Sequence, residues 1–462
     1  IGGLPANLWP GQRDYDQAIA VDVVGGNDRV YVGGSVVVPG GGTEWSASLW
    51  AFQTAAPPAA PAFAPVPAIS TAGAPPAGDG ADPAGLIGNN IHGDIHAIRL
   101  AGAPGARQVW VGCDGGVYRS DQAGRVNTFR PAMTGLAALE VGFHAPHPTS
   151  SHFGIIGCQD NGAQVRIGDT VWEETFVGDG GGVAFHPTRS QYVVAQWTRG
   201  SWYAQPAAGF FGPMARVQGG GAVTDPNNPG PYDAEDAASA FYSGAATIAR
   251  TATESRLAVG TDRVWLCDDV GVAPGGSTWR VLGFPDGPGA DQPGASAAPA
   301  WVGRRQQVGP PAVAPPGFLG PVIRLRWASP TVLLALYQRG IVRYVQTGAN
   351  WAATIISPGT PGEPTFAARN ELFTDIATLP MVGGAASNDF YLVTTGNTGT
   401  PATDTCFFYD SATPQFVATN LRRRLDDPVT GAPGPLDPAF AVVVDPTSAT
   451  DVYVGTVTGV WH

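Results

Sequence analysis

The 462-residue chain has no lysine, because each of its 25 basic residues is arginine, and only 13% of its residues are charged. That share is about half of what an average soluble domain carries. The formal net charge of −12 would repel phosphates, which argues against sequence-independent nucleic-acid binding. No uninterrupted apolar run reaches about 18 residues, so the sequence predicts no membrane-spanning helix.

Cysteine is also scarce, and the four that occur are far apart in the chain: Cys113, Cys158, Cys267 and Cys406. Such spacing fits neither a zinc-binding framework nor a disulfide-rich scaffold. We expect buried free thiols, with one disulfide bond as the alternative. Nucleotide-binding, lipase-type and zinc-protease motifs are missing, so the sequence gives no support to those activities.

Glycine and proline are abundant, with 64 and 43 residues, and they interrupt the chain throughout. The hydrophobic share of 44% is large enough for a substantial core, which excludes global disorder. Many short strands separated by turn residues are typical of an all-β fold.

Short strand patterns recur along the chain, as in 29–34, 108–113 and 451–456. Each belongs to a unit of strand, Asp or Pro turn, strand, Gly turn and strand, often followed by a Trp-bearing strand. We count eight units, starting near 18, 94, 140, 182, 243, 322, 374 and 439, of which the first and last look incomplete. Repeated four-stranded sheets cover each other's apolar faces when they are arranged around an axis. The sequence therefore predicts an all-β fold, a single β-propeller of seven or eight four-stranded antiparallel blades.

Residues 1–462 are expected to form this one domain, with long Pro/Ala/Gly-rich surface loops at about 54–85, 215–236 and 284–320. The chain begins with Ile1 rather than Met and ends within a strand pattern. We expect it to be part of a longer precursor whose signal peptide lies outside this sequence. High Arg, Ala, Gly and Pro with no Lys suggests a GC-rich bacterial genome, and the low charge favours a secreted or cell-surface location.

Two motifs resemble the BNR/Asp-box family of exported bacterial propellers, which is related to sialidases, oligoxyloglucan hydrolases and sortilin-like domains. The first is the stretch 111–121, Val-Gly-Cys-Asp-Gly-Gly-Val-Tyr-Arg-Ser-Asp. The second pairs Gly-Cys-Gln-Asp-Asn-Gly at 157–162 with Gly-Asp-Gly-Gly at 178–181. The resemblance implies the propeller fold, whereas the family's activities range from hydrolysis to binding. The Asp-box itself is degenerate here, and we find no sialidase arginine triad or tyrosine nucleophile by motif.

Three carboxylates, Asp114, Asp160 and Asp179, lie on glycine-flanked turns in consecutive units. Glycine permits a positive φ and close approach of a ligand, and equivalent turns lie on one face of a propeller. These residues are candidate catalytic acids for glycoside hydrolysis, with Gln159 and Asn161 as candidate binding residues beside them. The alternative is that each Asp caps its own turn.

A second cluster is His92-x-Asp94-x-His96. If this segment is a strand, the three side chains point the same way and are candidates for binding a ligand or a divalent metal ion. Asp94 orienting one His as a general base is another reading, and a turn with His packed at the rim is the structural alternative. A metal cofactor is therefore possible but not required by the sequence.

We weighed three functions. The first is an extracellular interaction module that binds a protein, glycan or surface polymer through blade-end loops. The second is a glycoside hydrolase, and the third is a structural domain of a larger surface assembly. Tryptophans such as Trp45, Trp50, Trp197 and Trp202 would stack on sugar rings if exposed, although blade packing accounts for most of them.

Overall fold

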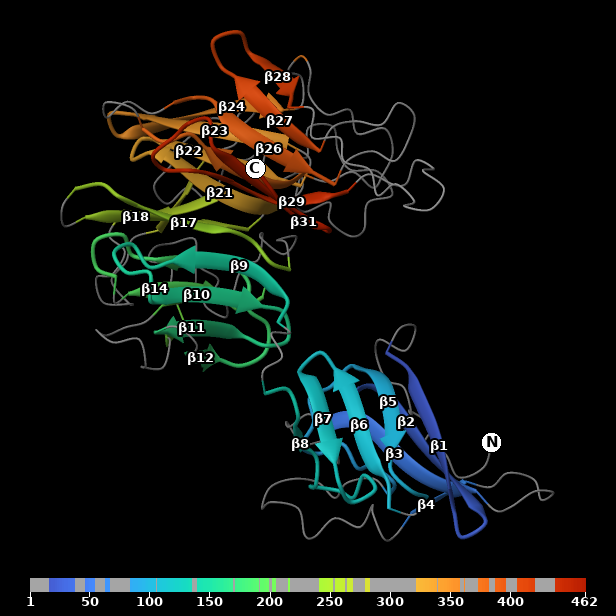
Figure 1. Cartoon of the computed structure of the whole chain (residues 1–462). Coiled ribbons are helices and arrows are strands. Elements are labelled where there is room, and N and C mark those ends of the chain that lie inside the picture. Colours follow the sequence, from blue (N-terminus) through green and yellow to red (C-terminus); the bar gives the residue numbers. More distant parts are fainter. Residues whose placement is uncertain are drawn as a thin grey trace, which may run out of the picture. The chain divides into compact units, whose positions relative to one another are not determined.

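The structure is a computed structural model of the chain, and it divides into two compact units, residues 1–140 and 141–462. Each unit is considered by itself. Every named element is a β-strand, as Figure 1 shows. The structure describes residues 16–37, 46–54, 63–66, 84–104, 106–134, 139–168, 171–190, 192–198, 202–204, 215–216, 241–251, 254–261, 264–268, 279–282, 321–338, 340–357, 361, 373–381, 387–395, 405–419 and 437–462.

The first unit contains two four-stranded antiparallel sheets. One comprises β1 (Ala18–Val24), β2 (Asn27–Val37), β3 (Ser46–Thr54) and β4 (Phe63–Pro65). The other comprises β5 (Ile95–Ala101), β6 (Gln108–Cys113), β7 (Gly116–Ser120) and β8 (Arg130–Pro131). In each sheet the strands are neighbours in chain order, which is the meander predicted from the repeats.

The second unit contains six sheets of the same kind. Five are four-stranded: β9 (Val141–Pro146) to β12 (Val171–Phe176), β13 (Val183–Phe185) to β16 (Ala215–Arg216), β17 (Ala245–Ala249) to β20 (Trp279–Leu282), β21 (Val322–Ser329) to β24 (Asn350–Ser357), and β25 (Phe373–Thr378) to β28 (Gln415–Ala418). The strands within them are β10 (Phe153–Cys158), β11 (Ala163–Ile167), β14 (Val193–Gln196), β15 (Trp202–Ala204), β18 (Ser255–Gly260), β19 (Val264–Cys267), β22 (Val332–Tyr337), β23 (Gly340–Thr347), β26 (Phe390–Thr394) and β27 (Cys406–Asp410). The sixth sheet has three strands, β29 (Ala439–Val444), β30 (Val452–Thr456) and β31 (Gly459–Trp461).

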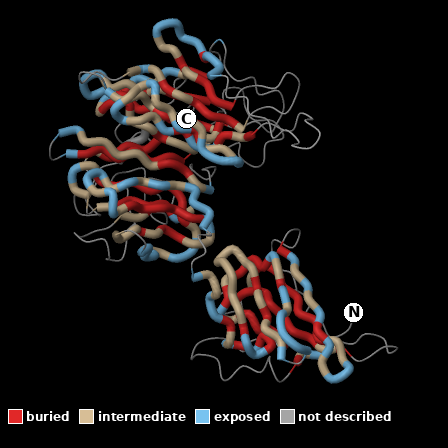
Figure 2. The backbone as a smooth tube through the Cα atoms, in the orientation of Figure 1, coloured by how far each residue is buried: buried red, intermediate tan, exposed pale blue. Residues whose placement is uncertain are grey.

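The second strand of a sheet is often buried on both faces, and its sequence shows why. β22 reads Val-Leu-Leu-Ala-Leu-Tyr and is buried at every position, as expected for a strand covered by a sheet on either side. Outer strands alternate instead: β24 buries Trp351 but exposes the residues on either side of it. The buried strands therefore lie between sheets, as Figure 2 shows for both units.

The cores are shared between consecutive sheets. One cluster joins Leu266 of the β17–β20 sheet to Leu325 and Trp351 of the β21–β24 sheet, and another joins Leu336 to Phe390 of the following sheet. In the second unit the first strands contact one another in order, β9 with β13, then β17, β21, β25 and β29. Face-to-face packing of antiparallel meanders along their first strands is the packing of propeller blades. The predicted all-β propeller fold class is confirmed.

The eight sheets begin within two residues of the eight unit starts predicted from the sequence. One detail differs: the first sheet has all four strands, and only the last has three among the described residues. The choice between seven and eight blades stays a prediction. The three loop insertions lie almost wholly outside the described residues. All four cysteines are free, in agreement with the expected buried thiols, although Cys113 is only partly buried.

Candidate functional sites

The two halves of the second family-like motif come together in the second unit. The turn after β10, residues 158–162, lies against the loop 178–182 that leads into β13. The amide of Gly162 donates to the carbonyl of Gly178 at 2.5 Å, and the amide of Gly180 donates to the carbonyl of Cys158 at 2.8 Å. We call these two segments the loop pair.

The glycines of the loop pair are required by close backbone approach. A Cβ on Gly157 would lie 1.9 Å from the carbonyl oxygen of Gly181, and one on Gly180 would lie 2.0 Å from that of Gly162. The sequence suggested that such glycines let a ligand approach. At these two positions the approaching group is the protein's own backbone, so the glycines fix the loop pair in place.

Asp179 is held as an acceptor at the loop pair. Its Oδ1 accepts the Tyr242 hydroxyl at 2.5 Å and, at 3.4 Å, the backbone amide of Asp160. Asp160 has a φ of 57°, which few non-glycine residues adopt, and this turn points its amide at Asp179. The predicted residues Asp160 and Asp179 are thus neighbours. As in the turn-capping alternative, Asp179 accepts a backbone amide, but this amide belongs to the other segment of the loop pair.

The two predicted binding residues flank Asp160 on the same turn. Gln159 is exposed, and Asn161 is half-buried with its amide donating to the Gln159 carbonyl at 3.0 Å. Both side chains therefore lie at the rim of the loop pair, beside the Asp160–Asp179 contact.

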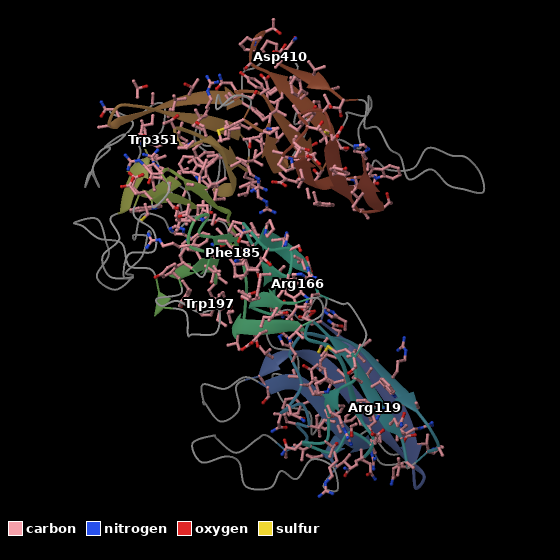
Figure 3. All side chains as sticks on the ribbon, turned by 60° about the vertical axis from the view of Figure 1, so that its left-hand side comes forward. Arg119, Arg166, Phe185, Trp197, Trp351 and Asp410 are labelled. Atoms are coloured by element: carbon pink, nitrogen blue, oxygen red, sulfur yellow. The ribbon has the colours of Figure 1, made fainter. Side chains whose placement is uncertain are left out.

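An aromatic surface borders the loop pair. Trp197, which follows β14, is 43% exposed (Figure 3). Its indole nitrogen lies close to Gly178, since a Cβ added to that glycine would be 2.9 Å from it. Phe241 is 45% exposed and packs edge-on against Tyr242 at 4.7 Å between ring centroids. Trp50 and Trp202 are buried by blade packing, as the sequence analysis expected for most tryptophans, and Trp45 lies outside the described residues.

Sequence reasoning missed Gln196, which fixes the relative positions of the loop pair and the segment around Tyr242. This fully buried side chain accepts the amides of Gly182 and Ser243 at 3.3 and 2.8 Å and donates to the Ser243 hydroxyl at 3.1 Å. Its only sequence signal was a polar residue ending an otherwise apolar strand. Tyr242 gave no signal because it reaches Asp179 from 63 residues away.

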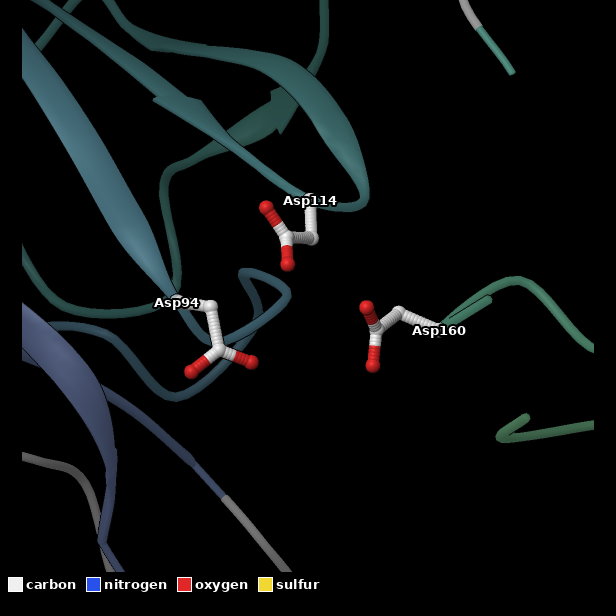
Figure 4. Close-up of side chains that lie close together, drawn as sticks. All are labelled: Asp94, Asp114 and Asp160. Atoms are coloured by element: carbon white, nitrogen blue, oxygen red, sulfur yellow. The ribbon is translucent and has the colours of Figure 1, made fainter. Parts of the chain in front are cut away.

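The first unit holds a second cluster at one end of its sheets. β5 and β6 are antiparallel with Ile95 opposite Cys113, so Asp94 before β5 and Asp114 after β6 are side by side (Figure 4). One carboxylate oxygen of each lies within 4.8 Å of the other. His96 contacts Asp114 at 2.5 Å through Nε2 and Asp16 at 3.5 Å through Nδ1. We call Asp16, Asp94, His96 and Asp114 the acidic cluster.

Asp16 is the buried member of the acidic cluster, with 0% of its side chain exposed. Neither of its carboxylate oxygens accepts a hydrogen bond from an N–H or hydroxyl group among the described residues, and its close neighbours are Asp94 and His96. Burial raises the pKa of Asp16 to about 6, and the neighbouring Asp94 carboxylate adds to the shift. Sequence analysis missed Asp16. Asp94 and Asp437 likewise stand just before the first strands of their sheets, β5 and β29.

The structure separates His92 from the other members of its predicted trio. β5 begins at Ile95, and Asp94 has a φ of 56°, so residues 92–94 precede the strand and do not alternate with His96 as strand residues would. His92 packs against Gly115. A Cβ added to Gly115 would lie only 2.3 Å from the Cβ of His92. Asp94 instead accepts the Ser35 hydroxyl at 2.6 Å. The segment is thus the turn that the sequence analysis gave as the structural alternative, and not a strand that presents all three side chains.

Of the catalytic candidates, Asp114 belongs to the first unit, and Asp160 and Asp179 belong to the second. Within each unit the nearest partner of the candidate is not a second open carboxylate. Asp114 is paired with an imidazole, and Asp179 is held by a phenol and a backbone amide. Over the described ranges, no helix has the length and hydropathy needed to cross a membrane.

Comparisons with known proteins add little to this picture. No protein-family model matches the sequence, and no curated protein matches it. Among solved structures, the β-propeller domain of Cps50 (Swd1) from Myceliophteria thermophila is similar, with 10% sequence identity and a TM-score of 0.41. The alignment covers 79% of this chain and 95% of that domain. The fold assignment therefore rests on the sheets themselves, and the BNR/Asp-box resemblance stays a prediction.

Proposed function

We propose that this protein is an interaction module that binds a glycan at the loop pair of its second unit. The observation that carries the proposal is the exposed indole of Trp197 beside the positioned carboxylate of Asp179. Asp179 lies in the loop that leads into β13, and Trp197 follows β14 of the same sheet. Buried hydrogen bonds of Gln196 to Gly182 and Ser243 fix the segments around them.

This combination suits a sugar ring chemically. One face of a pyranose is apolar and stacks on an exposed aromatic ring, while its hydroxyl groups need acceptors and donors at the edge. Asp179 uses Oδ1 for Tyr242 and Asp160, so Oδ2 is available to accept from a ligand hydroxyl. Gln159 and Asn161 add amide groups at the same rim.

Binding is favoured over hydrolysis because the Asp179 carboxylate is held as a fixed acceptor. A hydrolase needs one carboxylic acid and one carboxylate on either side of the scissile bond. Here Asp179 shares contacts with a phenol and a backbone amide, and Asp160 contributes its amide to that arrangement. Such groups orient a ligand without supplying the proton donor that cleavage requires.

The test is a binding screen against bacterial and plant polysaccharides, followed by calorimetry on the glycans that bind. We expect Trp197→Ala to weaken binding about tenfold and Asp179→Asn to weaken it about tenfold or more, the sizes typical of a stacking contact and of a charged hydrogen bond. Trp172→Ala is the matched control, because Trp172 is 40% exposed on β12 and lies outside the loop pair. Unchanged affinity in Trp197→Ala, or no glycan bound by the wild type, would refute the proposal.

A glycan partner of this kind would be met outside the cell, so the proposal includes the secreted or cell-surface location predicted from the sequence. Fractionation of the source cells with an antibody against the protein tests that part separately. Recovery in the cytoplasmic fraction alone would overturn the location and leave the binding measurement to stand by itself.

A further inference from the structure

We propose that the acidic cluster of the first unit binds one calcium-type divalent cation between Asp94 and Asp114, with Asp16 supporting the site from behind. This site is separate from the loop pair, and it does not depend on the glycan proposal.

The spacing of the two outer carboxylates fits one ion. Calcium bonds to oxygen are about 2.3–2.6 Å long, so two oxygens on the same ion are at most about 5 Å apart. The closest pair of oxygens from Asp94 and Asp114 lies within 4.8 Å. The antiparallel pairing of β5 with β6 holds both residues at this distance.

Asp16 is the independent observation that points to a ligand. Asp437 occupies the matching position, two residues before the first strand of the last sheet, and it is also buried. Asp437 accepts hydrogen bonds from the Thr456 hydroxyl at 2.7 Å and from the amide and hydroxyl of Thr458. Asp16 has no such donor among the described residues, and it lies against Asp94. A buried carboxylate without hydrogen-bond donors is costly, and the imidazole of His96, 3.5 Å away and 46% exposed, is a weaker counter-charge than a bound cation would be.

The charges within the cluster are unbalanced. Three carboxylates face one imidazole, and His96 is 46% exposed on the solvent side of the group. A divalent cation would neutralise the excess negative charge more fully than the imidazole does.

The donor atoms select the metal. Most donors of the cluster are oxygens: the carboxylates and, through Ser35, a hydroxyl group already bound to Asp94, with the imidazole of His96 as the nitrogen donor. Hard oxygen donors favour calcium or magnesium over zinc, which prefers sulfur and nitrogen. His92, the other histidine of the segment, packs on Gly115 and adds no nitrogen donor to the group. The site is thus predicted to prefer calcium.

The experiment is calorimetric titration of the chelator-treated full chain with calcium, with thermal unfolding followed in parallel. We expect one ion per chain, a higher unfolding temperature in calcium, and reversal by EGTA. Asp94→Asn and Asp114→Asn should each weaken calcium binding at least tenfold. Asp121→Asn is the control, since Asp121 is a surface carboxylate of the same unit paired with Arg119 at 3.1 Å, and it should bind as the wild type does.

Far-UV circular dichroism in EGTA shows whether each variant is folded, and the Asp→Asn changes keep the side-chain shape. Two results would overturn the proposal: no heat and no thermal shift for the wild type at millimolar calcium, or a wild-type response in both Asp94→Asn and Asp114→Asn. In either case His96 is the permanent counter-ion of the cluster. Glycan binding by the loop pair is measured in EGTA, so failure of one proposal is distinguishable from failure of the other.

Discussion

At the scale of the residue, burial sets how the histidines of the second unit respond to pH. His144 lies on β9 opposite Ile156, and its ring packs beside Gly154. Partial desolvation against the neighbouring strand lowers the pKa of His144 below its usual value, although the residue remains exposed to solvent. The fold therefore favours the neutral imidazole over the charged form.

The sign of the pH effect follows from this shift. The unfolded chain binds a proton near pH 6.5 more readily than the folded chain does, so stability falls as the pH drops from about 7 through the folded pKa. The midpoint of urea unfolding should fall between pH 7 and pH 5, and we predict that it falls less in His144→Asn than in the wild type. His152→Asn, a histidine in the turn before β10, is the control and should leave the loss unchanged. An unaltered pH profile in His144→Asn would contradict this account.

At the scale of the element, β10 contains two glycines in very different surroundings. A Cβ on Gly157 would meet the Gly181 backbone at 1.9 Å, whereas one on Gly154 would meet the His144 ring at 3.5 Å, an ordinary contact. We predict that Gly157→Ala destabilises the protein by about 1–3 kcal/mol, the usual cost of forcing extra atoms into a packed region. Gly154→Ala should cost less than about 1 kcal/mol. Equal stabilities of the two variants in urea unfolding would show that the loop pair is not closely packed against β10.

Elements were well predicted from the sequence, since strand patterns and turn residues repeat with a local signature. The start of each sheet was found within two residues, because Asp, Pro and Gly turns mark strand ends independently of tertiary contacts. The sequence left the segment around Asp94 open between a strand and a turn, because a positive φ at a non-glycine residue has no sequence signal. One local turn was enough to remove His92 from its expected partners.

The candidate sites were predicted in part. The loop pair was recognisable because both of its segments carry Asp between glycines, and these motifs met as neighbours in the structure. Tyr242, Gln196 and Asp16 were missed because each acts through contacts that join segments distant in the sequence. Such contacts depend on how sheets pack, which no local pattern encodes.

At the scale of the whole molecule, the sequence predicts that residues 1–462 are one propeller domain, and this stays a prediction. If it holds, the chain should unfold in one cooperative transition, with coincident curves from tryptophan fluorescence and far-UV circular dichroism. Differential scanning calorimetry of the full chain measures the same property through the ratio of the calorimetric to the van't Hoff enthalpy. Two resolved transitions would contradict a single domain.

The central claim is that the loop pair of the second unit is a glycan-binding site, and hydrogen–deuterium exchange with a glycan from the binding screen tests it most directly. We predict that the glycan slows amide exchange in 158–162, 178–182 and 196–197, and that Trp197→Ala abolishes this protection. Protection confined to other segments, or the same protection in Trp197→Ala, would contradict the claim.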